Sequence, residues 1–133
     1  MKPKTYKKKI TRFHALKILE WCKSKFGRGK QNYPSLQFRK PDYLNNPYAM
    51  GEYDYEDNFI FVNSQSHNDL LELANTIIHE YTHYRFHSKK EFYKYQNIAD
   101  YENNPMEIEA DSISELHQKN CISELKKQFH QFV

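Results

Sequence analysis

The sequence predicts an α+β fold in which a short, mostly antiparallel sheet of about three strands packs on one long helix, with flanking helices. Helices are predicted because apolar residues recur every three or four positions at 11–26, 67–87, 105–117 and 122–132. Strands are predicted because alternating or short apolar runs, bounded by Pro, Gly and Asn, occur at 36–39, 51–56 and 59–63.

Length and composition indicate a single domain at 10–133, preceded by a basic flexible arm at 1–9. The longest apolar run is Phe59–Val62, and no apolar segment follows the basic start. We therefore expect neither a membrane span nor a signal peptide, and a cytoplasmic location. Cys22 and Cys121 are far apart in the chain and are expected to be reduced structural thiols.

Charge is distributed unevenly along the chain. Residues 1–40 hold thirteen Lys and Arg and a single acid, Glu20, whereas the remainder holds seven Lys and Arg and sixteen acids. A basic segment of this kind suits an acidic partner or nucleic acid. We expect mainly a solvated lysine-rich face, because no Arg and aromatic pattern of a known nucleic-acid module accompanies it.

Local signals predict where several elements begin and end. Thr11 can cap the first helix and Gly27 can end it. Asp57 and Asn58 tolerate positive φ and predict a hairpin turn, and Pro105 suits the first position of a helix. Connecting segments are expected at 27–33, 41–49, 64–68 and 88–104.

The most informative motif is the H-E-x-x-H of residues 79–83, on the predicted helix at 67–87. Residues four apart share a helix face, so His79 and His83 can bind one Zn²⁺. Glu80 lies about 100° around the helix, where it can take a proton from water without being a ligand. On an otherwise apolar helix the two imidazoles need partners, and a metal would satisfy them.

A third ligand is expected downstream. A metzincin would carry Gly and His at the positions of Phe86 and Lys89, which excludes that type. His87 lies about 12 Å along the helix from His79 and is expected to be a surface histidine. Glu107 and Asp111 share a helix face, so Glu107 can bind the metal while Asp111 contacts a ligand imidazole. Glu109 points elsewhere, and its loss is expected to affect zinc affinity much less.

The H-E-x-x-H followed by Glu107-Ile108-Glu109-Ala110-Asp111 resembles the gluzincin zinc peptidases, and more closely their small ImmA/IrrE-like intracellular branch. The resemblance covers about residues 50–117. It implies a zincin-like domain with His79, His83 and Glu107 as zinc ligands, Glu80 as general base and Asp111 as the outer carboxylate. It also implies that residues 59–63 form the strand that pairs with an extended substrate.

The sequence departs from this family in two respects. Ser112-Ile113 replaces the usual Phe-Ala, and no helix-turn-helix module is attached. A SprT-type protease acting on DNA-bound proteins is a neighbouring alternative, in which His117 or His130 would be the third ligand. A non-catalytic, zinc-stabilised regulatory protein of a mobile element or phage is another alternative.

The sequence therefore predicts a zinc metalloendopeptidase, a hydrolase that acts on a protein or peptide substrate and not at a membrane. Glu80 would take a proton from the attacking water and deliver it to the leaving amine. A further group should stabilise the negative charge on the carbonyl oxygen. Tyr95, Tyr101 and His117 are the candidates, and spacing does not choose among them.

Overall fold

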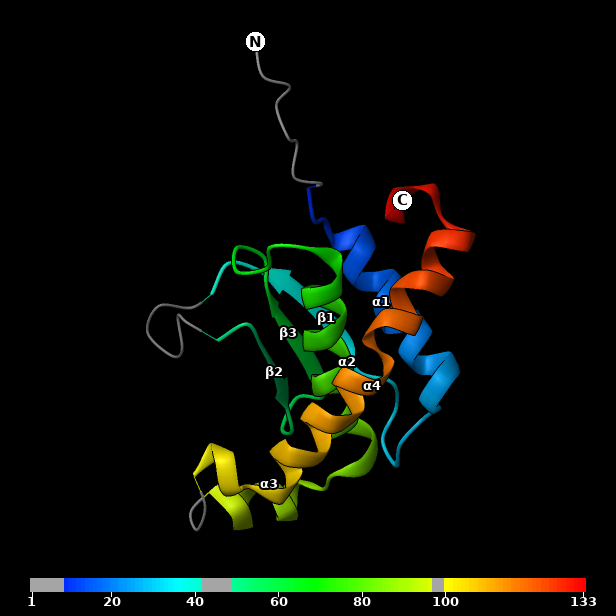
Figure 1. The fold of residues 1–133 in the computed structure, drawn as a ribbon. Helices are drawn as coiled ribbons and strands as arrows, with labels where there is room; N and C mark the ends of the chain where they lie inside the picture. Colours follow the sequence, from blue (N-terminus) through cyan, green and yellow to red (C-terminus); the bar gives the residue numbers. More distant parts are fainter. Residues whose placement is uncertain (1–8, 42–48, 97–99) are drawn as a thin grey trace.

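Helices and a small sheet make up the described part of the chain, which comprises residues 9–41, 49–96 and 100–133 of a computed structural model (Figure 1). The predicted α+β class is confirmed. The predicted arm at 1–9 and loop at 41–49 lie almost entirely outside the described residues. In chain order the elements are α1 (Arg12–Phe26), β1 (Ser35–Arg39), β2 (Gly51–Asp54), β3 (Phe59–Asn63), α2 (Leu70–Phe86), α3 (Lys89–Gln96), a 3₁₀ turn (Tyr101–Asn103), α4 (Pro105–Gln128) and a second 3₁₀ turn (His130–Phe132).

The sheet is mixed and has the strand order β1-β3-β2. β2 and β3 form the predicted antiparallel hairpin, whereas β1 pairs with β3 in parallel along its whole length, from Ser35 opposite Phe59 to Arg39 opposite Asn63. The prediction of a mostly antiparallel sheet is therefore wrong. Alternation along a strand reports which side chains are buried, but it does not report the direction of the neighbouring strand.

The hairpin turn follows the local signals. Asn58 has φ +52°, the left-handed conformation that Asn tolerates. The carboxylate of Asp54 accepts hydrogen bonds from the backbone N–H groups of Glu56 (2.8 Å) and Asp57 (2.7 Å). This contact starts the turn, so β2 ends at Asp54 and not at Glu56 as predicted.

Capping residues fix the ends of α1 and α2. The Thr11 N–H donates to His14 Nδ1 (3.0 Å) at the start of α1, and Gly27 ends that helix with φ +77°, as predicted. α2 begins three residues later than predicted because Asp69, whose carboxylate accepts from the N–H of Glu72 (2.8 Å), is its cap.

The third helical region differs from the prediction. Instead of two helices, α4 is continuous over 24 residues, with Pro105 in its first turn. No Gly or Pro interrupts the polar segment 118–120, and Cys121, Ile122 and Leu125 behind it are buried, so packing carries the helix onward. The predicted linker at 88–104 contains α3, a short helix without a buried residue.

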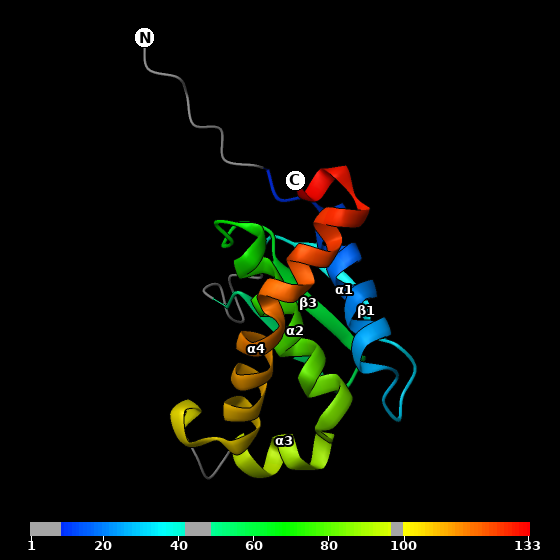
Figure 2. The same cartoon turned by 45° about the vertical axis from the view of Figure 1, so that its right-hand side comes forward.

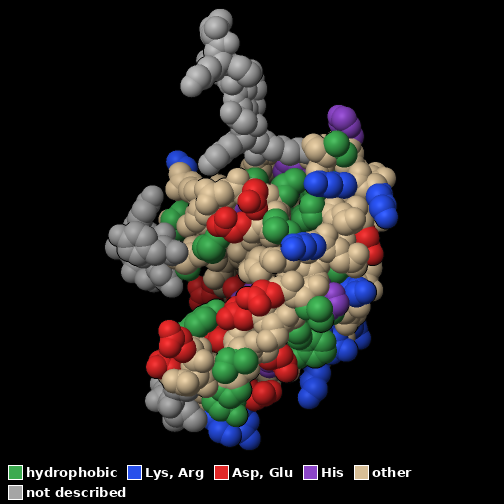
Figure 3. All heavy atoms as spheres, in the orientation of Figure 1, with side chains coloured by type: hydrophobic (Ala, Val, Ile, Leu, Met, Phe, Trp, Pro, Cys, Tyr) green, Lys and Arg blue, Asp and Glu red, His purple; other side chains and the backbone are tan. Residues whose placement is uncertain are grey.

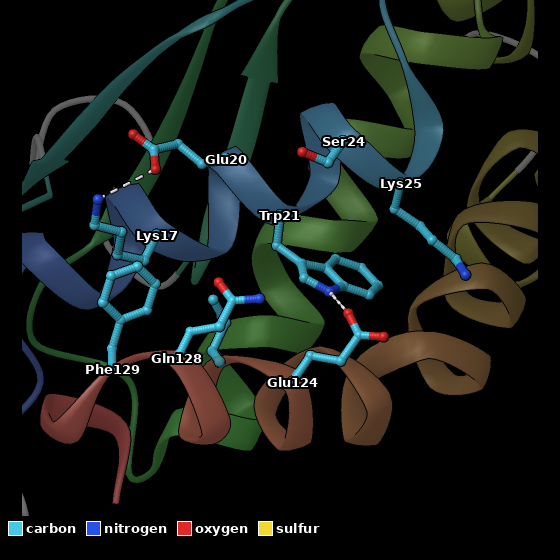
Figure 4. Close-up of a pocket in the computed structure, with 9 residues that line it drawn as sticks. Lys17, Glu20, Trp21, Ser24, Lys25, Glu124, Gln128 and Phe129 are labelled. Atoms are coloured by element: carbon cyan, nitrogen blue, oxygen red, sulfur yellow. Dashed lines mark hydrogen bonds and ion pairs between the residues drawn. The ribbon is translucent and has the colours of Figure 1, made fainter.

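α1 and α4 face each other across a groove (Figure 4). The indole N–H of Trp21 donates to the carboxylate of Glu124, which joins the two helices. Cys22 and Cys121 are buried and free, and burial raises the pKa of both thiols, that of Cys121 to about 12. This agrees with the predicted role as structural thiols.

α2 lies between the sheet and α4, so both of its sides are covered (Figures 1 and 2). Its central side chains, including Ile77, Ile78 and Tyr81, are completely buried. Among the described residues, none of the helices combines the length and apolar character that crossing a membrane requires. Because α2 is held on both sides, polar groups on it are rigidly placed.

Candidate metal and catalytic site

A cleft of about 460 Å³ opens beside α2 and is lined by residues of β2, α2, α3 and α4. Figure 3 shows Asp and Glu side chains gathered beside a hollow in this face of the molecule. The acidic residues that line the cleft are Glu52, Glu80, Glu107 and Asp111, and no described Lys or Arg lines it. The cleft therefore offers carboxylate and imidazole groups, which are donors for a divalent cation.

His79, Glu80 and His83 form a buried group on α2 that could hold a metal ion. The Nε2 atoms of the two histidines are 3.2 Å apart. From α4, Glu107 places Oε2 2.8 Å from His79 Nε2 and Oε1 2.9 Å from His83 Nε2. The structure thus brings the downstream carboxylate to the same point as the two imidazoles.

The donor set fits Zn²⁺. Two ligands bound tetrahedrally at 2.0–2.1 Å stand about 3.3 Å apart, close to the separation of the two Nε2 atoms. The Nδ1 atom of each imidazole has its own partner, which leaves both Nε2 atoms directed to the common point. Two imidazoles and one carboxylate are also a set found in catalytic zinc sites, where a fourth position stays open.

Asp111 orients His79. Its Oδ1 lies 2.9 Å from His79 Nδ1, one helical turn beyond Glu107 on α4. Burial by itself lowers the pKa of His79, but the hydrogen bond with Glu107 and the charges of Glu80, Glu107 and Asp111 outweigh burial and raise it to about 9. For Glu107 burial acts in the opposite direction and raises the pKa. The contacts of Glu107 with both histidines outweigh burial and hold its pKa well below the usual range. Without a metal, His79 is therefore expected to be protonated at neutral pH, beside the Glu107 carboxylate.

His87 orients His83, a role that the interpretation as a surface histidine missed. The Nδ1 atoms of His83 and His87 are 3.0 Å apart, and His87 Nε2 lies 2.8 Å from Glu109 Oε1. The side chain of His87 is only 6% exposed, so its interpretation as a surface histidine is wrong. Burial and the neighbouring His83 lower the pKa of His87, and a neutral ring can accept from His83 while donating to Glu109. The four-residue spacing from His83 was the available signal.

Glu80 lies beside the two histidines, and its carboxylate offers an oxygen within 4.8 Å of a ring nitrogen of each. Its Oε1 accepts a hydrogen bond from the backbone N–H of Tyr53 on β2 (3.1 Å). Burial raises the pKa of Glu80, although the two histidines partly oppose this. A carboxylate with a raised pKa, held at the wall of the cleft, is suited to accept a proton.

The strand beside the cleft is β2 and not β3. β3 pairs with a strand on each side, so its backbone groups are occupied and the expectation that it pairs with a substrate is wrong. The Tyr53 N–H reaches Glu80, which shows that this edge of β2 faces α2 and the cleft. The close approach requires Gly51, where a Cβ atom would lie 2.5 Å from Thr76 Cγ2 and 3.0 Å from the Phe61 carbonyl oxygen.

Of the three residues predicted to stabilise negative charge on the carbonyl oxygen, only Tyr101 lies at the cleft. Tyr101 lines the cleft and its hydroxyl donates to Asp111 Oδ1 (3.4 Å). His117 packs against Trp21 and Phe26, on the side of α4 that faces α1. Tyr95 does not line the cleft. Tyr55, which spacing did not single out among eleven tyrosines, does line it.

The alternative ligands fall outside the site, because neither His117 nor the exposed His130 lines the cleft. The SprT-type arrangement therefore gains no support from geometry. Comparison with protein-family models gave no match, and neither the curated proteins nor the solved structures contain a significant match to the chain. The geometry of His79, Glu80, His83 and Glu107 is therefore the basis on which a function is inferred.

Proposed function

We propose that the chain is a zinc-dependent peptidase with a zincin-like fold, which hydrolyses peptide bonds of a protein or peptide substrate. The observation that carries this proposal is the position of Glu80. A purely structural zinc site needs only its ligands, whereas Glu80 is an additional buried carboxylate beside them, bonded to the cleft strand.

His79, His83 and Glu107 would hold the metal, with His79 oriented by Asp111 and His83 by His87. Zn²⁺ bound there would polarise the scissile carbonyl and make a water molecule more acidic. Glu80 accepts the proton of the attacking water and then delivers it to the leaving amine. Its raised pKa suits both halves of this transfer.

The free edge of β2 supports an extended substrate. β2 is an edge strand whose outer edge faces the cleft, where the Tyr53 N–H meets Glu80, so a peptide can add beside β2 through the backbone groups that this bond does not occupy. Such pairing is independent of side chains, and it would place the scissile bond next to Glu80 and the two histidines. The acidic lining of the cleft would favour substrates that lack acidic side chains at this point.

Glu80→Gln tests the proposal, because glutamine keeps the shape and the acceptor for the Tyr53 N–H but cannot take a proton. We expect the variant to fold, to bind zinc stoichiometrically by metal analysis, and to lose cleavage. The measurement compares new peptide N-termini, by mass spectrometry, in cells that express wild type or Glu80→Gln. Identical sets of termini, with zinc bound in both proteins, would contradict the proposal and leave a zinc site without hydrolysis.

A further inference from the structure

Tyr55 has a buried hydroxyl group without a partner. The residue is 8% exposed, and its hydroxyl makes no hydrogen bond. Within the described residues, the only other buried side-chain polar atom in this condition is the hydroxyl of Ser66, which does not line the cleft. Leaving a buried hydroxyl unpaired is destabilising, so such a group calls for a functional explanation.

The ring of Tyr55 is firmly held at the candidate site. It stacks on Phe92 of α3 with 4.6 Å between ring centroids, and it meets Tyr53 at 4.7 Å. The ring of the ligand His83 lies 6.4 Å away, and Tyr55 lines the same cleft as Glu80 and Glu107. The Tyr55 ring is therefore fixed in the wall of this cleft, and the hydrogen-bonding capacity of its hydroxyl is unused.

Tyr101, the other tyrosine of the cleft wall, is a weaker candidate. It is 58% exposed, and its hydroxyl is already directed to Asp111. Tyr55, in contrast, is protected from water, which strengthens any hydrogen bond that it makes. Burial, and after it the charges of Glu80 and Glu107, raise the pKa of Tyr55 far above its usual value, so the phenol keeps its proton.

We propose that Tyr55 is a further catalytic residue, whose hydroxyl donates a hydrogen bond to the scissile carbonyl oxygen as that oxygen gains negative charge. The inference rests on the proposed peptidase function. No proton is transferred from Tyr55, since its part is to stabilise charge that develops in the transition state. The unpaired hydroxyl in the free protein is the preformed half of this hydrogen bond.

The test compares Tyr55→Phe with Tyr84→Phe. Tyr84 is also buried, but its hydroxyl donates to the Gln31 carbonyl (2.8 Å) and accepts from the Gly29 N–H (3.0 Å), and it does not line this cleft. In the metal-free protein, Tyr55→Phe should have a melting temperature equal to or above that of wild type, because no hydrogen bond is lost. Tyr84→Phe should melt at a lower temperature, because two bonds are lost.

The second readout is binding of acetohydroxamate, a small metal-directed ligand with a carbonyl oxygen, to the cobalt-substituted proteins, followed by visible absorption. Tyr55→Phe should bind it about tenfold or more weakly than wild type, as expected for a lost hydrogen bond to a charged oxygen. Tyr84→Phe should bind it as wild type does.

Equal affinity of wild type and Tyr55→Phe would overturn the role of Tyr55, and so would a lower melting temperature of metal-free Tyr55→Phe. Neither result would affect the Glu80→Gln test of hydrolysis. Failure of wild type to bind cobalt or acetohydroxamate would overturn both proposals, because no open metal site would exist. Weaker binding of acetohydroxamate by Tyr55→Phe, with a melting temperature no lower than that of wild type, would support the catalytic role of Tyr55.

Discussion

Each of the two candidate ligand histidines has its own outer partner, and the two partners differ. His79 contacts the carboxylate of Asp111 directly, whereas His83 reaches the carboxylate of Glu109 through His87. An outer partner fixes the ring orientation and makes the ligand nitrogen more basic. At the scale of single residues, α4 therefore supplies Glu107, which meets both imidazoles, and the two outer carboxylates, Asp111 and Glu109.

This arrangement predicts that His87→Ala and Glu109→Ala each weaken zinc binding about 10–100-fold, as is typical for loss of an outer partner. The expectation from spacing, a much smaller effect at Glu109, is revised accordingly. Competition with a chromophoric chelator measures the affinity, and Glu115→Ala, at an exposed acid of α4, is the matched control. Wild-type affinity in both variants, alongside a loss in Asp111→Ala, would contradict the role of His87.

At the scale of elements, the site depends on the contact between β2 and α2. Gly51 permits this contact, since a Cβ atom there would overlap Thr76 Cγ2, and Glu80 Cγ lies 3.5 Å away. Thr76 is itself restrained, because it is buried and its hydroxyl lies 2.9 Å from His67 Nε2. A side chain at position 51 must therefore separate the strand from the helix that carries Glu80.

Gly51→Ala should lower the free energy of unfolding by about 1–3 kcal/mol through overpacking, as measured by urea denaturation. Thr76→Ser removes the methyl group that the new Cβ meets, yet keeps the hydroxyl that contacts His67. The double variant should therefore recover part of the loss. Strictly additive effects of the two changes would show that the predicted overlap does not limit the packing of β2 on α2.

At the scale of the whole molecule, the charges around the candidate site link folding, metal binding and pH. The pKa of His79 is about 9 in the folded, metal-free protein, against about 6.5 in an unfolded chain. Protonation of His79 thus stabilises the metal-free fold fully below about pH 6.5, and this stabilisation is lost as pH rises through 9. Zinc must displace the same proton, so zinc binding has the opposite dependence on pH.

We expect the metal-free protein to lose stability between about pH 6.5 and 9, by at most about 3 kcal/mol from His79. Over the same range the apparent zinc affinity should rise by up to about tenfold per pH unit. Thermal unfolding and chelator competition measure the two trends. The stability trend should largely disappear in His79→Gln, and a flat wild-type profile would contradict the charge arrangement at the site.

The sequence by itself determined the features that depend on neighbouring residues. Thr11, Gly27, Asn58 and Pro105 act through capping, turn conformation and the missing N–H of proline, so the element ends at these four residues could be predicted from a few neighbours. The alignment of His79 with His83 also follows from the helical period alone.

Tertiary structure decided the features that join distant segments. The sheet became mixed because β1 pairs directly with β3, although β2 lies between them in the chain. This pairing left β2 at the edge beside the cleft. The side chain of His87 is largely covered and paired because Glu109, 22 positions further along the chain, meets it from α4. Tyr55 is notable for a partner that it lacks, and only the full set of packed neighbours can show that. Pairing and burial are properties of surfaces that meet in space, which local patterns of a single chain do not encode.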